Sequence, residues 1–261
     1  MESLFALRGT LSERAQSILW ILGVLFLLSL WQFCTFFVGP SLLPTPANVI
    51  NCLPELHFKD ALVRNLGYSL YLNFCGYIEA IIICIPIGFI IGLLPIFKGM
   101  FSKQVNAIRF LPLTAITGVC IAWFGIEDTM KIQFLTIGIA VYLLPVVIQR
   151  IDDVERVYQE TAFTLGASKW QTVKSVFFPG VFSKLFDDIR VLVAISWTYI
   201  IVAEMINKTG GVGAMIFTAS RQSRMDKVFA ILFIIVVLGF IQDKIFKIID
   251  KQMFPYKDNV S

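Results

Sequence analysis

Apolar residues occur in long blocks along the chain, and short polar segments separate these blocks. A helix needs about 20 apolar residues to cross a bilayer core of about 30 Å. Backbone groups in hydrocarbon must bond within their own segment, and the blocks lack the alternation of membrane β-strands, so each block is predicted to be a helix. The pattern predicts an all-α, polytopic membrane protein with six transmembrane helices, at 16–38, within 67–97, and at 106–126, 130–149, 183–206 and 227–249.

The composition supports a membrane protein. Of the 261 residues, 57% are hydrophobic and 15% are charged, whereas soluble domains average about 45–50% and about 25%. A soluble protein with a very large core is the alternative, and uncharged runs of this length argue against it. The run 18–38 follows Arg8 and Arg14, as in a signal peptide, but it is too long for one and lacks a small-residue cleavage site. It is therefore predicted to be a retained span.

The distribution of Lys and Arg predicts which side of the membrane each loop faces. With the N-terminus in the cytoplasm, the inner segments carry 14 of the 22 Lys and Arg residues and the outer segments carry 7, with Arg190 inside the fifth span. Both termini are therefore expected to be cytoplasmic. The expected organisation is a cytoplasmic N-terminus (1–15), a first transmembrane helix (16–38), an outer loop (39–66), a core of five transmembrane helices (67–255) with a cytoplasmic loop at 150–182, and a C-terminal tail (256–261).

Little in the sequence suggests catalysis or metal binding. The five cysteines form no CxxC, and four of them lie in apolar runs, so they are interpreted as small buried hydrophobic residues. The single histidine, His57, has no ligand-like neighbours. The glycine-rich stretch 209–213 lacks the Lys-Ser/Thr of a P-loop and is interpreted as an outer hairpin between the last two spans. We therefore expect no catalytic residue, no metal, no nucleic acid and no cofactor on this chain.

The cytoplasmic loop is predicted to contain two short helices. Apolar residues recur at helical spacing from Asp152 onward, and Asp152 or Asp153 would cap the first helix. Gly166 would end it, because glycine takes left-handed backbone angles at low cost. Ser168 and Gln171 then fit the capping box of a second helix. Such an element either rests on lipid headgroups or docks into a groove of a soluble partner.

The same loop carries a resemblance to a known family. Glu160-Thr161-Ala162, Gly166 and Val176-Phe177-Phe178-Pro179 resemble the "EAA" loop of ABC importer permeases, E-A-A-xxx-G-x9-I-x-L-P, with Thr161 in place of the first alanine. Residues 165–170, LGASKW, are typical of the branch that includes permeases for nitrate, sulfonates, taurine, bicarbonate and thiamine-precursor pyrimidines. Further stretches resemble this branch in the same order: Leu43-Pro44-Thr45-Pro46, Ile85-Pro86-Ile87-Gly88, Trp123-Phe124-Gly125-Ile126, Arg190, Trp197, Val202-Ala203-Glu204-Met205 and Gly211-Val212-Gly213.

The resemblance implies a subunit of an importer in the inner (plasma) membrane. Two permease subunits, by default a homodimer, would form the translocation pathway. Two cytoplasmic ATPase subunits would hold ATP and Mg²⁺, and an extracytoplasmic binding protein would deliver the substrate. The residues that would couple the permease to the ATPase are Glu160, Thr161, Ala162, Leu165, Gly166, Ala167, Ser168 and Lys169.

Polar and aromatic residues inside the spans are candidates for the substrate pathway, because charges at this depth are costly. The candidates are Glu79, Trp123, Ser196, Trp197, Thr198 and Glu204. Hydrogen bonds between helices are the alternative role for Glu79 and for residues 196–198. Glu204 would close an outer gate or cap the following loop. Arg190 is expected to pair with Asp187 or Asp188.

Two other classes of membrane protein remain as alternatives. A multi-span enzyme would need convergent acids, a nucleophile or a metal cluster, and a secondary transporter would be expected to show inverted repeats or broken helices. The expected substrate is a small anion such as a sulfonate, taurine, nitrate or bicarbonate, with a thiamine-precursor-like pyrimidine as the alternative.

Overall fold

The structure, a computed structural model, describes residues 11–255. The expected tail (256–261), most of the expected N-terminal segment (1–15), and Arg8 and Lys257 of the charge count lie outside the described residues. All regular elements within residues 11–255 are helices, which confirms the all-α prediction. The described chain divides into two compact units, one formed by residues 11–60 and 218–233 and the other by residues 61–217 and 234–255.

The smaller unit contains α1 (Glu13–Val38), α2 (Pro46–Asn51), α3 (Leu53–Phe58) and the first part of α12 (Met225–Met253). Nearly all apolar side chains of α1 are exposed, as expected for a helix that faces lipid. Trp31 connects α1 to the loop that follows it, because its indole N–H donates to the Pro44 carbonyl at 3.0 Å. The Trp31 ring also lies 5.9 Å from the Phe229 ring of α12.

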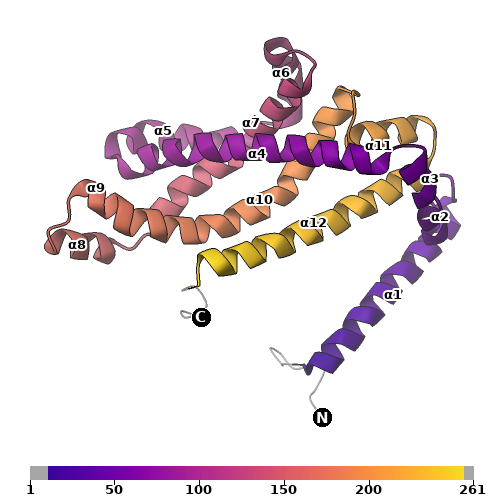
Figure 1. Cartoon of the computed structure of the whole chain (residues 1–261), viewed down its shortest axis with the longest axis horizontal. Helices are drawn as coiled ribbons and strands as arrows, with labels where there is room; N and C mark the ends of the chain where they lie inside the picture. The colour runs from indigo at the N-terminus through magenta and orange to yellow at the C-terminus, as the bar shows by residue number, and fades with distance from the viewer. Residues whose placement is uncertain (1–10, 256–261) are drawn as a thin grey trace. The chain divides into compact units, whose positions relative to one another are not determined.

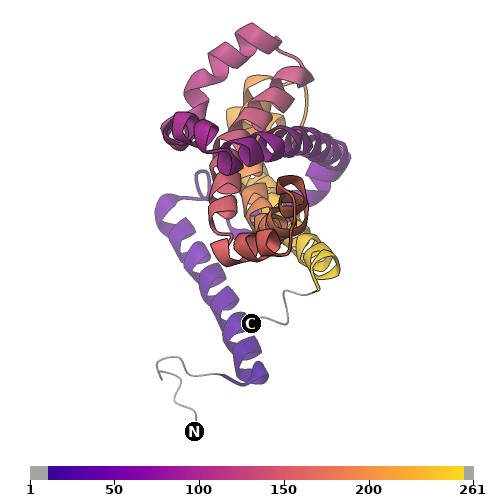
Figure 2. The same cartoon turned by 90° about the vertical axis from the view of Figure 1, so that its left-hand side faces the viewer.

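The larger unit is built around α4 (Leu62–Leu93), α7 (Asp128–Asp152) and α10 (Phe178–Ile206). Figure 1 and Figure 2 both show α4 and α7 running side by side, with α10 packed against α7. The fully buried apolar residues of this core come from all three helices: Leu72, Ala80, Phe134, Leu135, Ile139, Leu143, Val147, Leu185 and Ile200.

Small residues let α4 and α7 approach closely. A Cβ added at Gly76 would lie 2.9 Å from Leu135 Cδ2, and one added at Gly88 would lie 2.5 Å from Val147 Cγ1. Helices in lipid gain stability mainly from van der Waals packing, so small residues are favoured where backbones meet. The two glycines therefore set the spacing of the core pair.

The segment expected as a third span, 106–126, is not one straight helix. It is divided between the end of α5 (Pro95–Ala107), two 3-10 turns (Ile108–Phe110 and Leu113–Ile116) and α6 (Thr117–Phe124). The halves Pro95–Phe110 and Leu113–Phe124 meet at 92°. Pro112 lies at the break; it has no amide N–H to continue a helix, and it forces Leu111 into extended backbone (ψ 119°).

Five helices of the described chain are long and apolar enough to cross a membrane, and six if the bent pair forms one span. They are Glu13–Val38, Leu62–Leu93, Asp128–Asp152, the continuous helical stretch Lys169–Ile206, and Met225–Met253. The first four residues of that stretch form α9 (Lys169–Thr172), which continues through a π-helical turn (Val173–Phe177) into α10.

The short elements follow the long ones at their ends. α8 (Arg156–Thr164) lies between α7 and α9, and α11 (Val212–Arg221) lies between α10 and α12. The expected cap at Asp152 or Asp153 is wrong, because α7 continues through Asp152 and Asp153 is its C-cap. The N-cap of α8 is Glu155, without a side-chain hydrogen bond. The stretch expected as an outer hairpin, 209–213, is a turn that leads into α11.

Candidate functional site

The segment from Val154 to Thr172, called the elbow below, is bent by its own backbone. α8 ends in a Schellman arrangement: the Gly166 N–H donates to the Phe163 carbonyl and the Ala167 N–H donates to the Ala162 carbonyl, both at 2.9 Å. Gly166 has φ +80°, which a residue with a Cβ adopts only at a cost. The prediction that Gly166 ends the first helix is therefore confirmed.

The start of α9 is fixed in the same local way. The Gln171 N–H donates to Ser168 Oγ at 3.3 Å, and the Ser168 N–H donates to Gln171 Oε1 at 2.7 Å, which confirms the predicted capping box. The Thr172 hydroxyl donates to the Ser168 carbonyl at 3.1 Å, and Thr172 is buried. Both arms of the elbow are thus held by hydrogen bonds that span five residues or fewer.

Five large apolar side chains of the elbow are exposed, Phe163 among them; the other four, Val157, Tyr158, Leu165 and Trp170, we call the docking face. Leu165 is 83% exposed and Trp170 is 75% exposed. Glu160 is also exposed, whereas Ala162 and Ala167 are half-buried. The Thr161 hydroxyl is used within α8, where it donates to the Val157 carbonyl at 2.7 Å. Clustered apolar side chains at a polar surface mark an interaction site for another protein or for lipid.

Charged contacts join α7 to α10 and to α5 next to the elbow. Arg150, near the end of α7, donates two hydrogen bonds to the Asp188 carboxylate of α10, at 2.6 and 2.8 Å, and a third to Asp153 at 2.8 Å. Lys98 of α5 pairs with Asp152. A two-point guanidinium–carboxylate contact is strong and fixes orientation. The end of α7, directly before the elbow, is therefore held to α10.

The expected pairing of Arg190 is confirmed for Asp187 but not for Asp188. Arg190 lies 3.6 Å from the Asp187 carboxylate and 3.2 Å from that of Asp243. Asp188 instead contacts Arg150, 38 residues earlier in the chain. Nothing in the local sequence indicates a contact of that separation.

Glu79 makes hydrogen bonds between the two core helices. Its half-buried carboxylate accepts from Gln133 Nε2 at 2.8 and 2.9 Å and from the Thr136 hydroxyl at 3.2 Å, both on α7. This geometry agrees with the interhelical role that the sequence analysis kept open. Part of the side chain stays accessible.

The candidates at 196–198 do not converge on one site. The Ser196 hydroxyl is fully buried, 2.7 Å from the Val193 carbonyl and 3.0 Å from Asn73 Oδ1 of α4. The Trp197 indole is buried and donates to Gln242 Oε1 at 2.7 Å. Thr198 is exposed on another face of α10. Trp123, on α6, is 72% exposed and belongs to none of these contacts.

Glu204 is fully buried at the end of α10 opposite the elbow. Its carboxylate accepts from the Ser69 hydroxyl at 2.6 Å and from the Gly213 N–H at 2.8 Å. Ser69 in turn accepts from the Val212 N–H at 2.9 Å. The Gly211 N–H donates to Asn65 Oδ1 at 2.9 Å. We call Asn65, Ser69, Glu204 and the backbone of 211–213 the Glu204 cluster; it joins α4, α10 and α11.

Sequence reasoning missed a second polar group near this end. The Lys131 side chain is fully buried, and its ammonium lies 3.0 Å from the Tyr68 hydroxyl, 2.8 Å from the Thr209 hydroxyl and 3.7 Å from the Asp128 carboxylate. Tyr68 also bonds to Asp128. The three-residue spacing of Asp128 and Lys131 in a helix was the one available signal. The contacts with Tyr68 and Thr209 have no sequence signal.

The described residues provide no group of three His, Cys, Asp or Glu side chains that could hold a metal ion. All five cysteines are free. What the larger unit offers is a bundle of apolar helices with polar groups between them and a rigid, partly apolar elbow at one end.

This combination defines a membrane transport subunit, and the chain belongs to the family described as "Binding-protein-dependent transport system inner membrane component", which it matches over residues 84–255. It is similar to the taurine transport system permease protein TauC of Escherichia coli, with 26% identity over 88% of this chain and 86% of that protein. It is also similar to the aliphatic sulfonates transport permease protein SsuC of Bacillus subtilis, with 25% identity over 92% and 89%.

Solved structures show the same fold. The inward-facing methionine ABC transporter MetNI matches with a TM-score of 0.66 and 18% identity, over 73% of this chain and 95% of that one. An amino acid ABC transporter matches with a TM-score of 0.56 over 77% and 96%. The predicted resemblance to importer permeases of the nitrate, sulfonate and taurine branch is confirmed. The chain is a multi-pass permease subunit of the inner membrane, and a secondary transporter or a membrane enzyme is not favoured.

Proposed function

We propose that this permease receives mechanical work from separate ATPase subunits through the elbow, with both chain termini in the cytoplasm. The observation that carries the proposal is the docking face: exposed apolar side chains on a segment whose bend is locked by its own backbone. A helix that presents such side chains fits a groove on a partner protein. The residues proposed to form this coupling element are Glu160, Thr161, Ala162, Leu165, Gly166, Ala167, Ser168 and Lys169.

The connection behind the elbow supports this role. Arg150 holds Asp188 of α10 and Asp153, the residue directly before the elbow. A partner that pulls on the docking face would therefore displace α7 and α10 as a body rather than deform a loop. Rigid-body motion about packed interfaces is a common basis of alternating access.

We propose that two copies of the chain enclose the pathway. Glu79, Trp123 and Thr198 are partly or well exposed and are proposed to contact the substrate. Ser196, Trp197 and Glu204 are buried and are proposed to position the helices that form the wall, with Glu204 holding the outer end closed.

The proposed substrate is a small sulfonate such as taurine, because TauC and SsuC are among the relatives that match over most of the chain. Nitrate and bicarbonate are related small anions. The formylaminopyrimidine transport permease protein ThiX of Halalkalibacterium halodurans, 22% identical over 89% of this chain, keeps a pyrimidine as the alternative. A thermal-shift screen of the cognate binding protein separates them: we expect taurine or an alkanesulfonate to raise its unfolding temperature. A shift with the pyrimidine alone would reject the sulfonate.

The coupling proposal is tested by charging the docking face. Leu165→Glu adds a charge to an 83% exposed side chain, so the fold should be retained. We expect the amount of ATPase subunit that co-purifies with the tagged permease to fall at least about tenfold. An unpaired charge buried at an interface lowers the binding affinity by more than about tenfold. The matched control is Leu42→Glu, at a 66% exposed site in the 39–66 segment, which should co-purify normally. Normal co-purification of the Leu165 variant would indicate that this face rests on lipid instead.

A further inference from the structure

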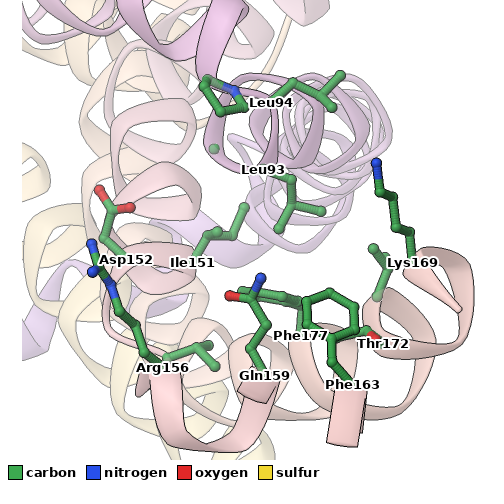
Figure 3. A pocket seen from close by; sticks show the side chains of 14 residues that line it. Leu93, Leu94, Ile151, Asp152, Arg156, Gln159, Phe163, Lys169, Thr172 and Phe177 are labelled. Carbon is green, nitrogen blue, oxygen red and sulfur yellow. The ribbon is translucent and has the colours of Figure 1, made fainter. Parts of the chain in front are cut away.

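A cavity of about 730 Å³ lies between the elbow and the helix ends above it. Its walls come from the α4–α5 junction, from the end of α7, and from α8, α9 and the π-helical turn, all within the larger unit. The apolar part of the wall includes Leu93, Leu94, Ile151, Phe163 and Phe177. Figure 3 shows these side chains around one opening. The cavity lies between the elbow and the ends of the core helices. The side chains of the docking face do not line it.

Three polar side chains of the lining have no partner among residues 11–255. Arg156 and Gln159 extend from α8, and Lys169 extends from α9 (Figure 3). None of the three side chains makes a hydrogen bond or an ion pair within the described chain. Asp152 also lines the cavity, but its carboxylate is already paired with Lys98. The lining therefore carries two uncompensated positive charges and a free amide beside an apolar wall.

We propose that this cavity binds an anionic phospholipid, with the phosphate held by Arg156, Gln159 and Lys169 and the start of an acyl chain against the apolar wall. A cavity of this size is far larger than a small oxyanion, and its mixed lining matches a molecule with an anionic head and an apolar chain. The ends of α4 and α7 border it, which places it at the level of the lipid headgroups. Basic pockets between helices on the cytoplasmic side are suited to anionic headgroups.

The proposal assigns Lys169 a role in addition to its proposed place in the coupling element. A lipid in this cavity would brace the elbow against α4 and α7 from the side opposite the docking face. The proposal rests on the proposed function in one respect only: the proposed function places the cavity on the cytoplasmic side of the membrane. Lipid binding in detergent does not depend on that side, so the two can fail separately.

The experiment is native mass spectrometry of the full-length protein in detergent, titrated with phosphatidylglycerol, phosphatidylcholine or inorganic phosphate. We expect phosphatidylglycerol to be retained in preference to phosphatidylcholine. Each basic side chain near an anionic surface contributes about fivefold in affinity, so Arg156→Ala/Lys169→Ala should weaken retention about 25-fold. The control Lys174→Ala/Lys184→Ala removes the same charge from exposed residues outside the cavity and should change retention less than about threefold.

Three results would overturn the proposal. Equal retention of phosphatidylglycerol and phosphatidylcholine would show that the cavity does not select a lipid by its charge. An equal loss of phosphatidylglycerol retention in the control variant would show that only the net charge of the protein matters. Full competition by inorganic phosphate would identify a free-anion site instead of a lipid site. Circular dichroism and thermal unfolding of both double variants establish that the comparison is between folded proteins.

Discussion

The elbow and the Glu204 cluster lie at opposite ends of α10 and are stabilised by different kinds of contact. The elbow is shaped by hydrogen bonds between neighbours in sequence, such as those of Gly166 and Ser168, and it leaves large apolar side chains uncovered. The Glu204 cluster is buried and joins residues as distant as Ser69 and Glu204, which are 135 positions apart. The hydrogen bonds that shape the elbow are local, whereas those of the cluster form only when three helices are assembled.

This difference matches the tasks proposed for the two ends. An element that must be gripped and moved needs a shape that survives displacement, and local bonds provide this. A closed end needs contacts that are lost together when helices separate, and a buried network of long-range hydrogen bonds provides this. The comparison predicts that substitutions in the cluster chiefly lower stability, whereas substitutions on the elbow chiefly change coupling.

The largest effect is expected for Gly213→Ala in the Glu204 cluster. A Cβ at this position would overlap the Ile201 carbonyl and approach Glu204 Cβ to 2.8 Å. The carbonyl belongs to the backbone of α10 and cannot rotate away, so α11 must shift and the Gly213–Glu204 hydrogen bond is lost. Overpacking of this kind costs about 3 kcal/mol, measurable as a large drop in thermal unfolding temperature in detergent.

The control for this prediction is Gly99→Ala. Gly99 lies within α5 with no atom within 4 Å of an added Cβ, so the alanine should be neutral or stabilise the helix by up to about 1 kcal/mol. An unfolding temperature of Gly213→Ala equal to that of the unmodified protein would mean that the cluster adapts freely. The contrast between a rigid elbow and an assembled cluster would then be lost.

The same contrast explains how far the sequence alone could predict the structure. The end of α8 at Gly166 and the Ser168 capping box were predicted because each depends on residues a few positions apart. The long apolar blocks were predicted because the lipid bilayer requires apolar side chains along the whole span, whatever particular contacts each side chain makes. The third span was expected as one helix over 106–126, whereas the structure has two halves that meet at 92°. The break at Pro112 was missed because the apolar pattern of this stretch is continuous.

The remaining features had no local signal. Arg150 contacts Asp188 and Lys131 contacts Tyr68 through the packing of helices that are distant in sequence. Which polar group faces which depends on helix rotation and depth, and hydropathy does not determine either. The cavity beside the elbow is lined by four separate segments of the chain. The sequence therefore could not predict that Arg156 and Lys169 line the same cavity.

An intermediate effect is expected where α7 is fastened to α10 next to the elbow, and two adjacent aspartates provide the test. Asp188→Asn weakens both hydrogen bonds from Arg150, at a cost of about 1–2 kcal/mol. Asp187→Asn affects an exposed ion pair at 3.6 Å and should cost less than about 0.5 kcal/mol. Because Asp188 joins α10 to the end of α7 next to the elbow, we also expect ATP hydrolysis by the assembled complex in proteoliposomes to respond less to substrate in that variant.

A matched response of the two aspartate variants would place the coupling route elsewhere. If Asp188→Asn lowered stability but left substrate-stimulated hydrolysis unchanged, the contact would be structural only. The comparison of elbow and cluster would then become a difference in stability alone.

The smallest effect is expected from Glu55 in the smaller unit, whose carboxylate is partly exposed and contacts residues that are distant in sequence. The Arg224 guanidinium donates to Glu55 at 2.9 Å and the Lys227 ammonium lies 3.3 Å from the same carboxylate. These contacts, Arg224 foremost, lower the pKa of Glu55 to about 2, from about 4.3 in an unfolded chain. A lowered pKa stabilises the fold above about pH 4.3, and this contribution is lost as the pH falls toward 2.

Thermal unfolding between pH 5 and pH 2 should therefore show a steeper loss for the unmodified protein than for Glu55→Gln, which lacks the titrating group. The control is Glu127→Gln, an exposed carboxylate without an ion pair in the described chain, which should follow the unmodified protein. Since the Glu55 side chain is 30% exposed, added salt should reduce the difference. A salt-independent difference as large as that of Gly213→Ala would show that long-range contacts govern stability at the surface as they do in the Glu204 cluster, and exposure would no longer separate the two.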